Sequence, residues 1–310
     1  MNRLILPTIL SLLIFGCSSP HEEKPSDTEK TEANQPVVPN SNSSTVGAIS
    51  ETGGVSDEGD TRNVQELLEE LLRAKNPGYK GGVQFEMDQG LPVGISLAGL
   101  DVEDISMLED LPLLALDLSG TRVSDISVLK GMPLRMLAME QTRVEDLSPL
   151  KDSQIQQLHL NNTRVRNLQG IEGLPIRELY LPETRVVDLS PLVGMPITGL
   201  WLNDTDVEDI TVLGTMPLET VTLRGTRVKD LTPLARVAQL KRIHIAETRV
   251  EDLTPIAGLQ LTRLLFTPSR INKGMDLIRL MPTLKELGDS FDSRMPPVQF
   301  WPKYDAGGYR

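Results

Sequence analysis

Aliphatic residues recur along most of this chain at one fixed spacing. A valine or isoleucine returns every 21 residues, with one step of 22 between Val228 and Val250. Nearly the same text surrounds each of these positions, so nine units are visible. A fixed period of this length indicates a repeat architecture in which each unit stacks on the next. The repeated positions are Val102, Val123, Val144, Val165, Val186, Val207, Val228, Val250 and Ile271.

Each unit contains a Leu-x-Leu step, which has the period of a β-strand. Leu116 and Leu118 therefore face the same side of a short strand, and Val123 and Ile126 turn inward from the loop that follows. One unit cannot bury its own apolar side, but stacked units bury a continuous aliphatic core beneath a parallel sheet. Nine strands at about 4.8 Å predict an arc roughly 40 Å long.

The segment that returns from one strand to the next is short. In several units a hydroxyl residue precedes a proline, which is a signal for the start of a helix. We expect the hydroxyl to be the N-cap of a brief 3₁₀ helix, because few residues follow before the next strand. The pairs are Ser148-Pro149, Ser190-Pro191, Thr232-Pro233 and Thr254-Pro255.

The repeated text, as in residues 116–129 and 179–192, resembles bacterial leucine-rich repeats. It is similar to the internalin and phosphatase-regulatory class, and more similar still to planctomycete-type repeats. The resemblance covers residues 62–310 and implies an α/β leucine-rich-repeat solenoid, with a curved parallel sheet and a short 3₁₀ or irregular convex side. Threonine stands where most such repeats have asparagine, and its hydroxyl is expected to satisfy a backbone group of the loop. Examples are Thr121, Thr142, Thr163 and Thr184.

The open ends of a solenoid expose apolar faces and need caps. Residues 62–97 are expected to form an N-terminal cap, with a helix capped by Thr61 or Asn63, a turn at Asn76, and a hairpin. Residues 98–288 hold the repeats, and the apolar residues between Met275 and Met281 predict a longer closing helix.

Residues 289–310 are expected to form a C-terminal capping tail. The tail holds five of the eleven aromatic residues of the chain, and its closing text is similar to the tail of planctomycete-type repeats. We expect these rings to pack on the last repeat, and the alternative is an exposed aromatic motif for a partner. They are Phe291, Phe300, Trp301, Tyr304 and Tyr309.

The first residues have the anatomy of an export signal. Arg3 precedes an apolar run that is too short to span a bilayer, which takes about 20 residues. The text that ends in Gly16-Cys17 resembles the bacterial lipoprotein box, although Phe15 is bulkier than usual there. This predicts a signal peptide over 1–16 and acylation of Cys17, the one cysteine. The alternative is an ordinary signal peptide with an incidental cysteine.

Residues 17–61 are rich in small, polar and acidic residues and contain no aromatic residue. We expect a lipid-anchored disordered linker with a mean reach of about 35–40 Å. The predicted location is the cell envelope, lipid-anchored and exported. In a Gram-negative host the outer membrane is favoured, because Ser18 rather than aspartate follows the anchor.

The candidate binding residues fall in columns on the concave side of the predicted sheet. His159, Tyr180 and Trp201 lie on consecutive strands about 5 Å apart, and exposed Tyr and Trp on a rigid surface are typical binding anchors. The surrounding positions add amides and a charge gradient, with Glu toward one end and Arg toward the other. The further residues assigned to this face are His244, Glu140, Glu178, Asn161, Asn203, Arg224, Arg242 and Arg263.

A purely structural interpretation of the columns stays open, because cross-strand packing of the rings can simply stiffen a sheet.

The charged residues of the loops also have a structural interpretation. In the loops, arginines such as Arg122 lie three residues before an aspartate such as Asp125, which predicts charges that hydrogen-bond along the edge; the alternative is a docking edge. Four carboxylates between Asp204 and Asp209 are interpreted as a solvated acidic turn rather than a calcium site.

Composition narrows the function. The net charge of −12 argues against nucleic acid or an anionic membrane surface as the main partner. No phosphate loop or zinc-ligand spacing is present in the sequence, and His159 and His244 are about 20 Å apart by strand spacing. We therefore expect no enzyme activity, no cofactor and no metal.

The sequence thus predicts a monomeric, non-catalytic envelope lipoprotein. Its concave face is expected to bind a protein partner, which the sequence does not identify. The alternatives are carbohydrate or peptidoglycan binding by the same face, or a structural envelope protein.

Overall fold

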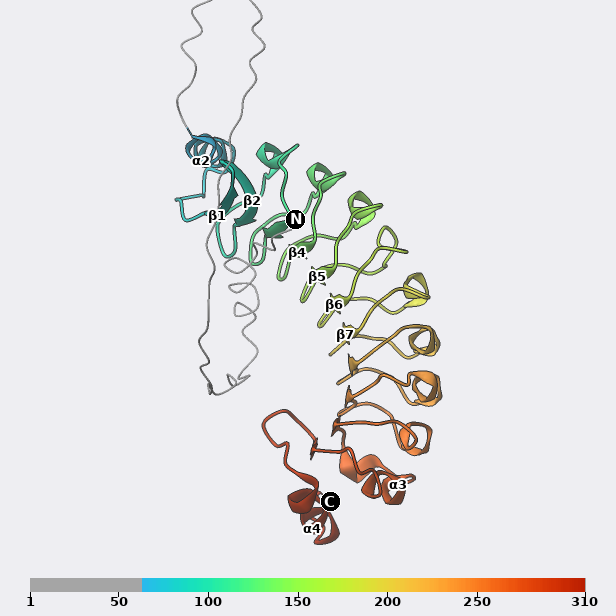
Figure 1. Ribbon diagram of the computed structural model, residues 1–310. Helices are drawn as coiled ribbons and strands as arrows, with labels where there is room; N and C mark the ends of the chain where they lie inside the picture. The colour runs from blue at the N-terminus through green and yellow to red at the C-terminus, as the bar shows by residue number, and fades with distance from the viewer. Residues whose placement is uncertain (1–62, 310) are drawn as a thin grey trace, which may run out of the picture.

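The computed structural model describes residues 63–309 of the chain. They form a curved solenoid with a single eleven-stranded sheet along its inner side (Figure 1). The strands follow one another in sequence order, and every neighbouring pair is parallel except the first. The predicted signal peptide 1–16, the anchor Cys17 and the linker 17–61 lie outside the described residues.

The repeat strands are short and pair in register. Each of the nine strands after the opening hairpin has three residues, and its central residue is a buried aliphatic. The strands are β1 (Gln84–Asp88), β2 (Leu91–Ser96), β3 (Ala115–Asp117), β4 (Met136–Ala138), β5 (Gln157–His159), β6 (Glu178–Tyr180), β7 (Gly199–Trp201), β8 (Thr220–Thr222), β9 (Arg242–His244), β10 (Arg263–Leu265) and β11 (Glu286–Gly288).

The convex side carries 3₁₀ helices, as predicted. One unit differs: no 3₁₀ helix forms between β5 and β6, where Gln169-Gly170 replaces the Ser-Pro pair and Gly170 has a φ of 96°. The helices are η1 (Ser106–Leu108), η2 (Ser127–Leu129), η3 (Ser148–Leu150), η4 (Ser190–Leu192), η5 (Thr211–Thr215), η6 (Thr232–Arg236) and η7 (Thr254–Ile256). A further 3₁₀ helix, η8 (Pro268–Arg270), follows β10 directly.

The expected cap of these helices was wrong. The hydroxyl residue is the first residue of the helix rather than its N-cap, and the capping group is an aspartate two residues earlier. In η3, Asp146 Oδ1 accepts from the backbone N–H of Ser148 at 2.8 Å, and Asp146 Oδ2 accepts from the Ser148 hydroxyl at 2.7 Å. The carboxylate thus satisfies the free N–H at the start of the helix, and Pro149 at the next position has no N–H to satisfy.

The repeated threonines act as expected. Thr163 Oγ1 donates to the carbonyl of Leu160 at 2.7 Å, and the side chain is buried. The same bond occurs in seven units and satisfies a buried carbonyl where the chain leaves the strand. Its donors are Thr121, Thr142, Thr163, Thr184, Thr205, Thr226 and Thr248.

The N-terminal cap consists of α2 (Val64–Lys75) and the β1–β2 hairpin. Asn63 caps α2 by accepting from Glu66 N–H at 2.9 Å, and Leu68 and Leu72 bury the inner face of the helix. Asn76 is buried in the turn that follows, and its Oδ1 accepts from the backbone N–H groups of residues 103 and 104. β2 also pairs in parallel with β3, so the hairpin starts the repeat sheet.

The C-terminal cap differs in detail from the prediction. The closing helix α3 (Met275–Arg279) has five residues and is not the longer helix expected, since Pro282 follows closely and disfavours further helix. A second helix, α4 (Pro297–Asp305), lies at the end of the solenoid and buries Phe300 fully against Phe266. The aromatic tail therefore packs on the last repeat.

No helix within residues 63–309 has the length and apolar character needed to cross a bilayer.

Candidate binding face

Three aromatic rings form a continuous stack on the inner sheet. His159, Tyr180 and Trp201 occupy the same register position on β5, β6 and β7. The His159 and Tyr180 ring centroids are 4.1 Å apart at an interplanar angle of 12°, and those of Tyr180 and Trp201 are 3.9 Å apart at 6°. The parallel register predicted from the sequence thus produces a ladder of nearly parallel rings.

The flat orientation of the indole depends on a glycine. A Cβ built on Gly199 would lie 2.6 Å from Cζ3 and Cη2 of Trp201, a distance that carbon atoms do not tolerate. The bare α-carbon therefore lets the six-membered part of the indole lie over its own strand. The signal in the sequence for this contact is a glycine two residues before an outward-facing tryptophan.

The rings are less exposed than predicted, because stacking covers their faces. Tyr180 and Trp201 are half-buried and His159 is buried. Polar contacts fix the ends of the rings: His159 Nδ1 lies 3.2 Å from Glu140 Oε1, and the Tyr180 hydroxyl donates to Glu178 Oε2 at 3.3 Å. The two glutamates at this end of the face thus orient the stack.

The three arginines differ in how far their charge is compensated. Arg224 lies between Asp204 and Glu247, each at 3.0 Å, and Arg263 forms an ion pair with Glu286. Arg242 Nε donates to Thr220 Oγ1 at 2.9 Å, and within residues 63–309 it has no ion pair. Of the three arginines in the predicted charge gradient, Arg242 on β9 is therefore the one whose charge no carboxylate of the described residues compensates.

His244 lies on the concave side and lines the cavity there, but its ring is covered rather than open. Its side chain is 3 % exposed, and the ring of Phe291, from the loop before α4, contacts it edge-on at a centroid distance of 5.2 Å. Burial lowers the pKa of His244 to about 4, although an interaction with the main chain of Asp289 acts in the opposite direction. Neither ring nitrogen reaches full hydrogen-bond geometry with a partner. The repeat pattern could not predict this cover, because Phe291 belongs to the tail that follows the repeats.

The asparagines next to the stack lie just beyond their strands. The carbonyls of Asn161 and Asn203 accept from the backbone N–H groups of residues 141 and 183, so their main chains continue the sheet ladder. The side-chain Oδ1 of Asn203 is buried and accepts no hydrogen bond. Both residues border the stack, as the column predicted.

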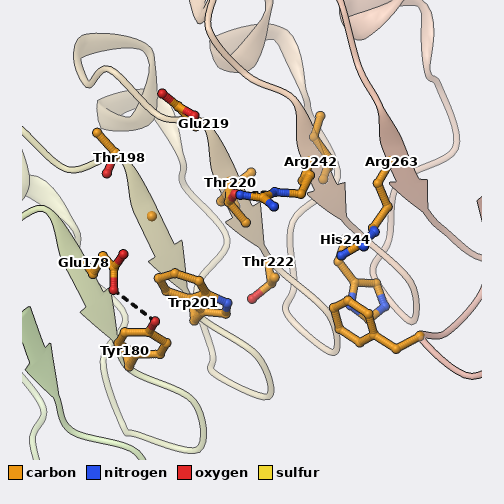
Figure 2. A pocket seen from close by; sticks show the side chains of 14 residues that line it. Glu178, Tyr180, Thr198, Trp201, Glu219, Thr220, Thr222, Arg242, His244 and Arg263 are labelled. Atoms are coloured by element: carbon orange, nitrogen blue, oxygen red, sulfur yellow. Dashed lines mark hydrogen bonds between the residues drawn. The ribbon is translucent and has the colours of Figure 1, made fainter. Parts of the chain in front are cut away.

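A cavity of about 410 Å³ opens next to Trp201 (Figure 2). Trp201 forms one side, Thr220 and Thr222 lie at its floor, and Arg242 and His244 lie across from the indole. Phe291 also lines it. The stack and this cavity lie next to each other on the concave face and together offer a place for a ligand group.

Charges pair along the loop edge, as expected, but in the described part of the chain the arginines do not pair with the aspartates that follow them by three residues. Three of these arginines pair with acids of the preceding unit, as Arg227 does with Asp206 at 2.6 Å, and the others are Arg122 and Arg164. In five loops the aspartate three residues after the arginine instead caps a 3₁₀ helix, as Asp230 does. Two carboxylates of the acidic turn also form ion pairs: Asp204 pairs with Arg224, and Glu208 pairs with Lys229. Across residues 63–309, no group of three His, Cys, Asp or Glu side chains is arranged to hold a metal ion.

Comparison with solved structures places this architecture among known folds. An internalin from Listeria monocytogenes superposes with a TM-score of 0.56 at 23% identity, over 63% of this chain and 66% of the internalin. A leucine-rich-repeat protein from Leptospira interrogans gives 0.52 at 18% identity, over 74% of this chain and 64% of the other. The fold is a leucine-rich-repeat solenoid.

A plant structure shares the same fold. The leucine-rich-repeat ectodomain of a membrane receptor kinase from Arabidopsis thaliana gives a TM-score of 0.54 at 16% identity, over 75% of this chain and 31% of the ectodomain. No protein-family model and no curated protein matches the sequence. At these identities the likeness establishes the fold.

Proposed function

We propose that this chain is a non-catalytic protein of the cell envelope that binds a protein partner through its concave face. The observation that carries the proposal is the rigid stack of His159, Tyr180 and Trp201 beside an open cavity of about 410 Å³. Preorganised aromatic rings lose little side-chain entropy when a partner covers them, so they are efficient binding anchors.

The fold supports the same proposal. Solenoids present extended concave surfaces that suit macromolecular partners. The Arabidopsis ectodomain was solved in complex with Casparian strip integrity factor 2. Fold likeness alone does not specify a function, so the ring stack carries the argument.

The test is a crosslinking capture with the full chain in its native envelope. Replacement of both Tyr180 and Trp201 by alanine should abolish the captured protein bands, because the anchors are removed. The matched control is Val193→Ala, a side chain that is 63 % exposed beyond the 3₁₀ helix η4 on the convex side. Unchanged capture by the double variant would reject the concave face and favour a structural envelope protein.

A second candidate is carbohydrate or peptidoglycan binding by the same face. The observation that favours it is the buried, unbonded Oδ1 of Asn203 near stacked rings, since sugars combine an apolar face with hydroxyl groups. A glycan array probed with the full chain and with Trp201→Ala separates this candidate from the first.

The lipid anchor is part of the proposal and rests on the text around Cys17. Metabolic labelling with an alkyne fatty acid should mark the wild-type chain and not Cys17→Ser. Fractionation of the same cells tests the envelope location, and outer-membrane recovery is expected in a Gram-negative host. Monomeric behaviour is checked by light scattering.

A further inference from the structure

The ring ladder on the concave sheet lacks one member. The column that carries Tyr180 and Trp201 continues with Thr222 on β8 and His244 on β9. A small side chain therefore interrupts a row of rings that resumes one strand later. The centroid spacings of 3.9 and 4.1 Å on the preceding strands show that this face accommodates one flat ring for each strand.

The indole has one covered face and one that borders the cavity. Tyr180 stacks on the side toward β6. Glu178 and Tyr180 line the cavity on the side toward β6, whereas Thr222, Arg242 and His244 lie on the side toward β8 and β9 (Figure 2). We call this cavity, which extends from the indole of Trp201 to residues of β9, the slot.

Two polar features restrict what fits this slot. The hydroxyl of Thr222 is buried at the floor and has no hydrogen-bond partner, which favours a ring with a polar tip. Arg242 is the rim cation without an ion pair within the described range, whereas neighbouring Lys241 pairs with Glu219 at 3.0 Å. A guanidinium without a counter-charge favours a carboxylate near the entering ring.

We infer that the slot binds a tyrosine side chain of the partner protein, with an acidic residue beside that tyrosine. The phenol ring stacks on the face of Trp201 that borders the cavity, its hydroxyl approaches Thr222, and the carboxylate pairs with Arg242. This inference rests on the proposed function and names the segment that the face recognises. Residues 18–61 of this chain contain no aromatic residue, so they cannot supply the ring.

The test uses a short peptide and the two tryptophans of the chain as NMR reporters. The peptide acetyl-Asp-Tyr-Glu-amide is titrated into the purified full chain, and the indole N–H signals of Trp201 and Trp301 are followed. Ring stacking should shift the Trp201 signal upfield and leave Trp301 unchanged. A matched peptide with leucine in place of tyrosine should bind about tenfold more weakly, because it cannot stack.

Two variants examine the slot itself. Thr222→Tyr supplies the missing ring from within the chain and should abolish the shift while the protein stays folded. The control is Val193→Tyr, which adds the same ring on the convex side and should leave binding unchanged. Arg242→Gln should weaken the acidic peptide about threefold and leave acetyl-Ala-Tyr-Ala-amide unaffected.

The inference fails under any of three results: Trp201 does not respond, the leucine peptide binds equally well, or Thr222→Tyr still binds. A Trp201 shift with chitotriose but not with the tyrosine peptide would replace the tyrosine by a sugar. The capture experiment distinguishes the two proposals. Capture that depends on Tyr180 and Trp201, with no peptide response, would keep the binding face and reject only the tyrosine slot.

Discussion

The indole of Trp201 lies over the bare α-carbon of Gly199, two residues earlier on the same strand. This contact sets the plane of the indole and thereby the plane on which Tyr180 stacks. The shape of the candidate binding face therefore depends on the smallest residue in it.

Gly199→Ala should displace the indole. The added methyl group overlaps the ring, and overpacking of this kind costs about 1–3 kcal/mol. We expect a lower midpoint of urea unfolding and a changed Trp201 indole signal. Gly258→Ala is the matched control, since a Cβ there meets no atom within 4 Å. An unchanged Trp201 signal in Gly199→Ala would show that the ring does not need the glycine.

Thr163→Val should destabilise the solenoid by about 0.5–1.5 kcal/mol, because the buried Leu160 carbonyl loses its hydroxyl donor and keeps only the backbone N–H of residue 163 at 3.2 Å. Thr163→Ser keeps the donor and should lose less. Urea unfolding of both variants measures the difference. If serine is no better than valine, the methyl group rather than the hydrogen bond is what this position requires.

The capping aspartates should make stability fall in acid. The backbone N–H of Ser148 and then its hydroxyl hold the pKa of Asp146 below its ordinary value. A carboxyl whose folded pKa is depressed stabilises the fold above its unfolded pKa of about 3.9, and this contribution is lost as the pH falls through the folded pKa. Six more aspartates have the same depressed pKa: Asp104, Asp125, Asp188, Asp209, Asp230 and Asp252.

Thermal unfolding between pH 7 and pH 3 measures this effect. Asp146→Asn should lower the unfolding temperature at pH 7 and reduce its dependence on pH below 5. Glu109→Gln removes an exposed carboxylate whose side chain caps no 3₁₀ helix, so it should change neither. The idea is contradicted if the two variants have the same pH profile.

His244 should stay neutral until the pH approaches 4, because burial lowers its pKa to about that value. The unfolded chain takes up the proton near pH 6.5, so the buried ring stabilises the fold above pH 6.5 and loses that contribution as the pH falls toward 4. Two-dimensional NMR of the imidazole reports the titration directly. Phe291→Ala should admit water and raise the pKa, whereas Phe291→Leu should change it less. A pKa near 6.5 in the wild-type chain would rule out the burial of this ring.

Phe300→Ala should destabilise the C-terminal cap. Its ring is fully buried beside Phe266, and truncation of such a residue costs about 3–5 kcal/mol. Val298→Ala, in the same helix but 77 % exposed, is the control. Hydrogen exchange should increase first in β10 and β11, since terminal units of a solenoid contact one neighbour only. Uniform loss of protection would instead indicate that the repeats unfold as one unit.

Much of the fold was predictable because adjacent repeat units have nearly the same sequence and therefore make the same contacts with each other. Val123 and Val144 occupy equivalent positions, so the contact of one unit with the next is specified once and then repeated. The threonine hydrogen bond followed for the same reason. The helix caps were misassigned because the hydroxyl and the aspartate are both good capping groups, and only the backbone path selects between them.

The candidate face was predictable in its members and less so in its geometry. The column pattern placed Tyr180 next to Trp201, because parallel strands in register align equivalent positions. It did not reveal that His244 is covered, since Phe291 arrives from outside the repeats.

The sequence alone determined the repeat, the sheet order and which side chains line the concave column, because a 21-residue period fixes register by local chemistry. Tertiary structure decided the plane of the Trp201 ring, the compensation of each arginine and the cover over His244. These depend on distances between side chains of different units and of the tail, and such distances arise only when the curved stack and its cap pack together.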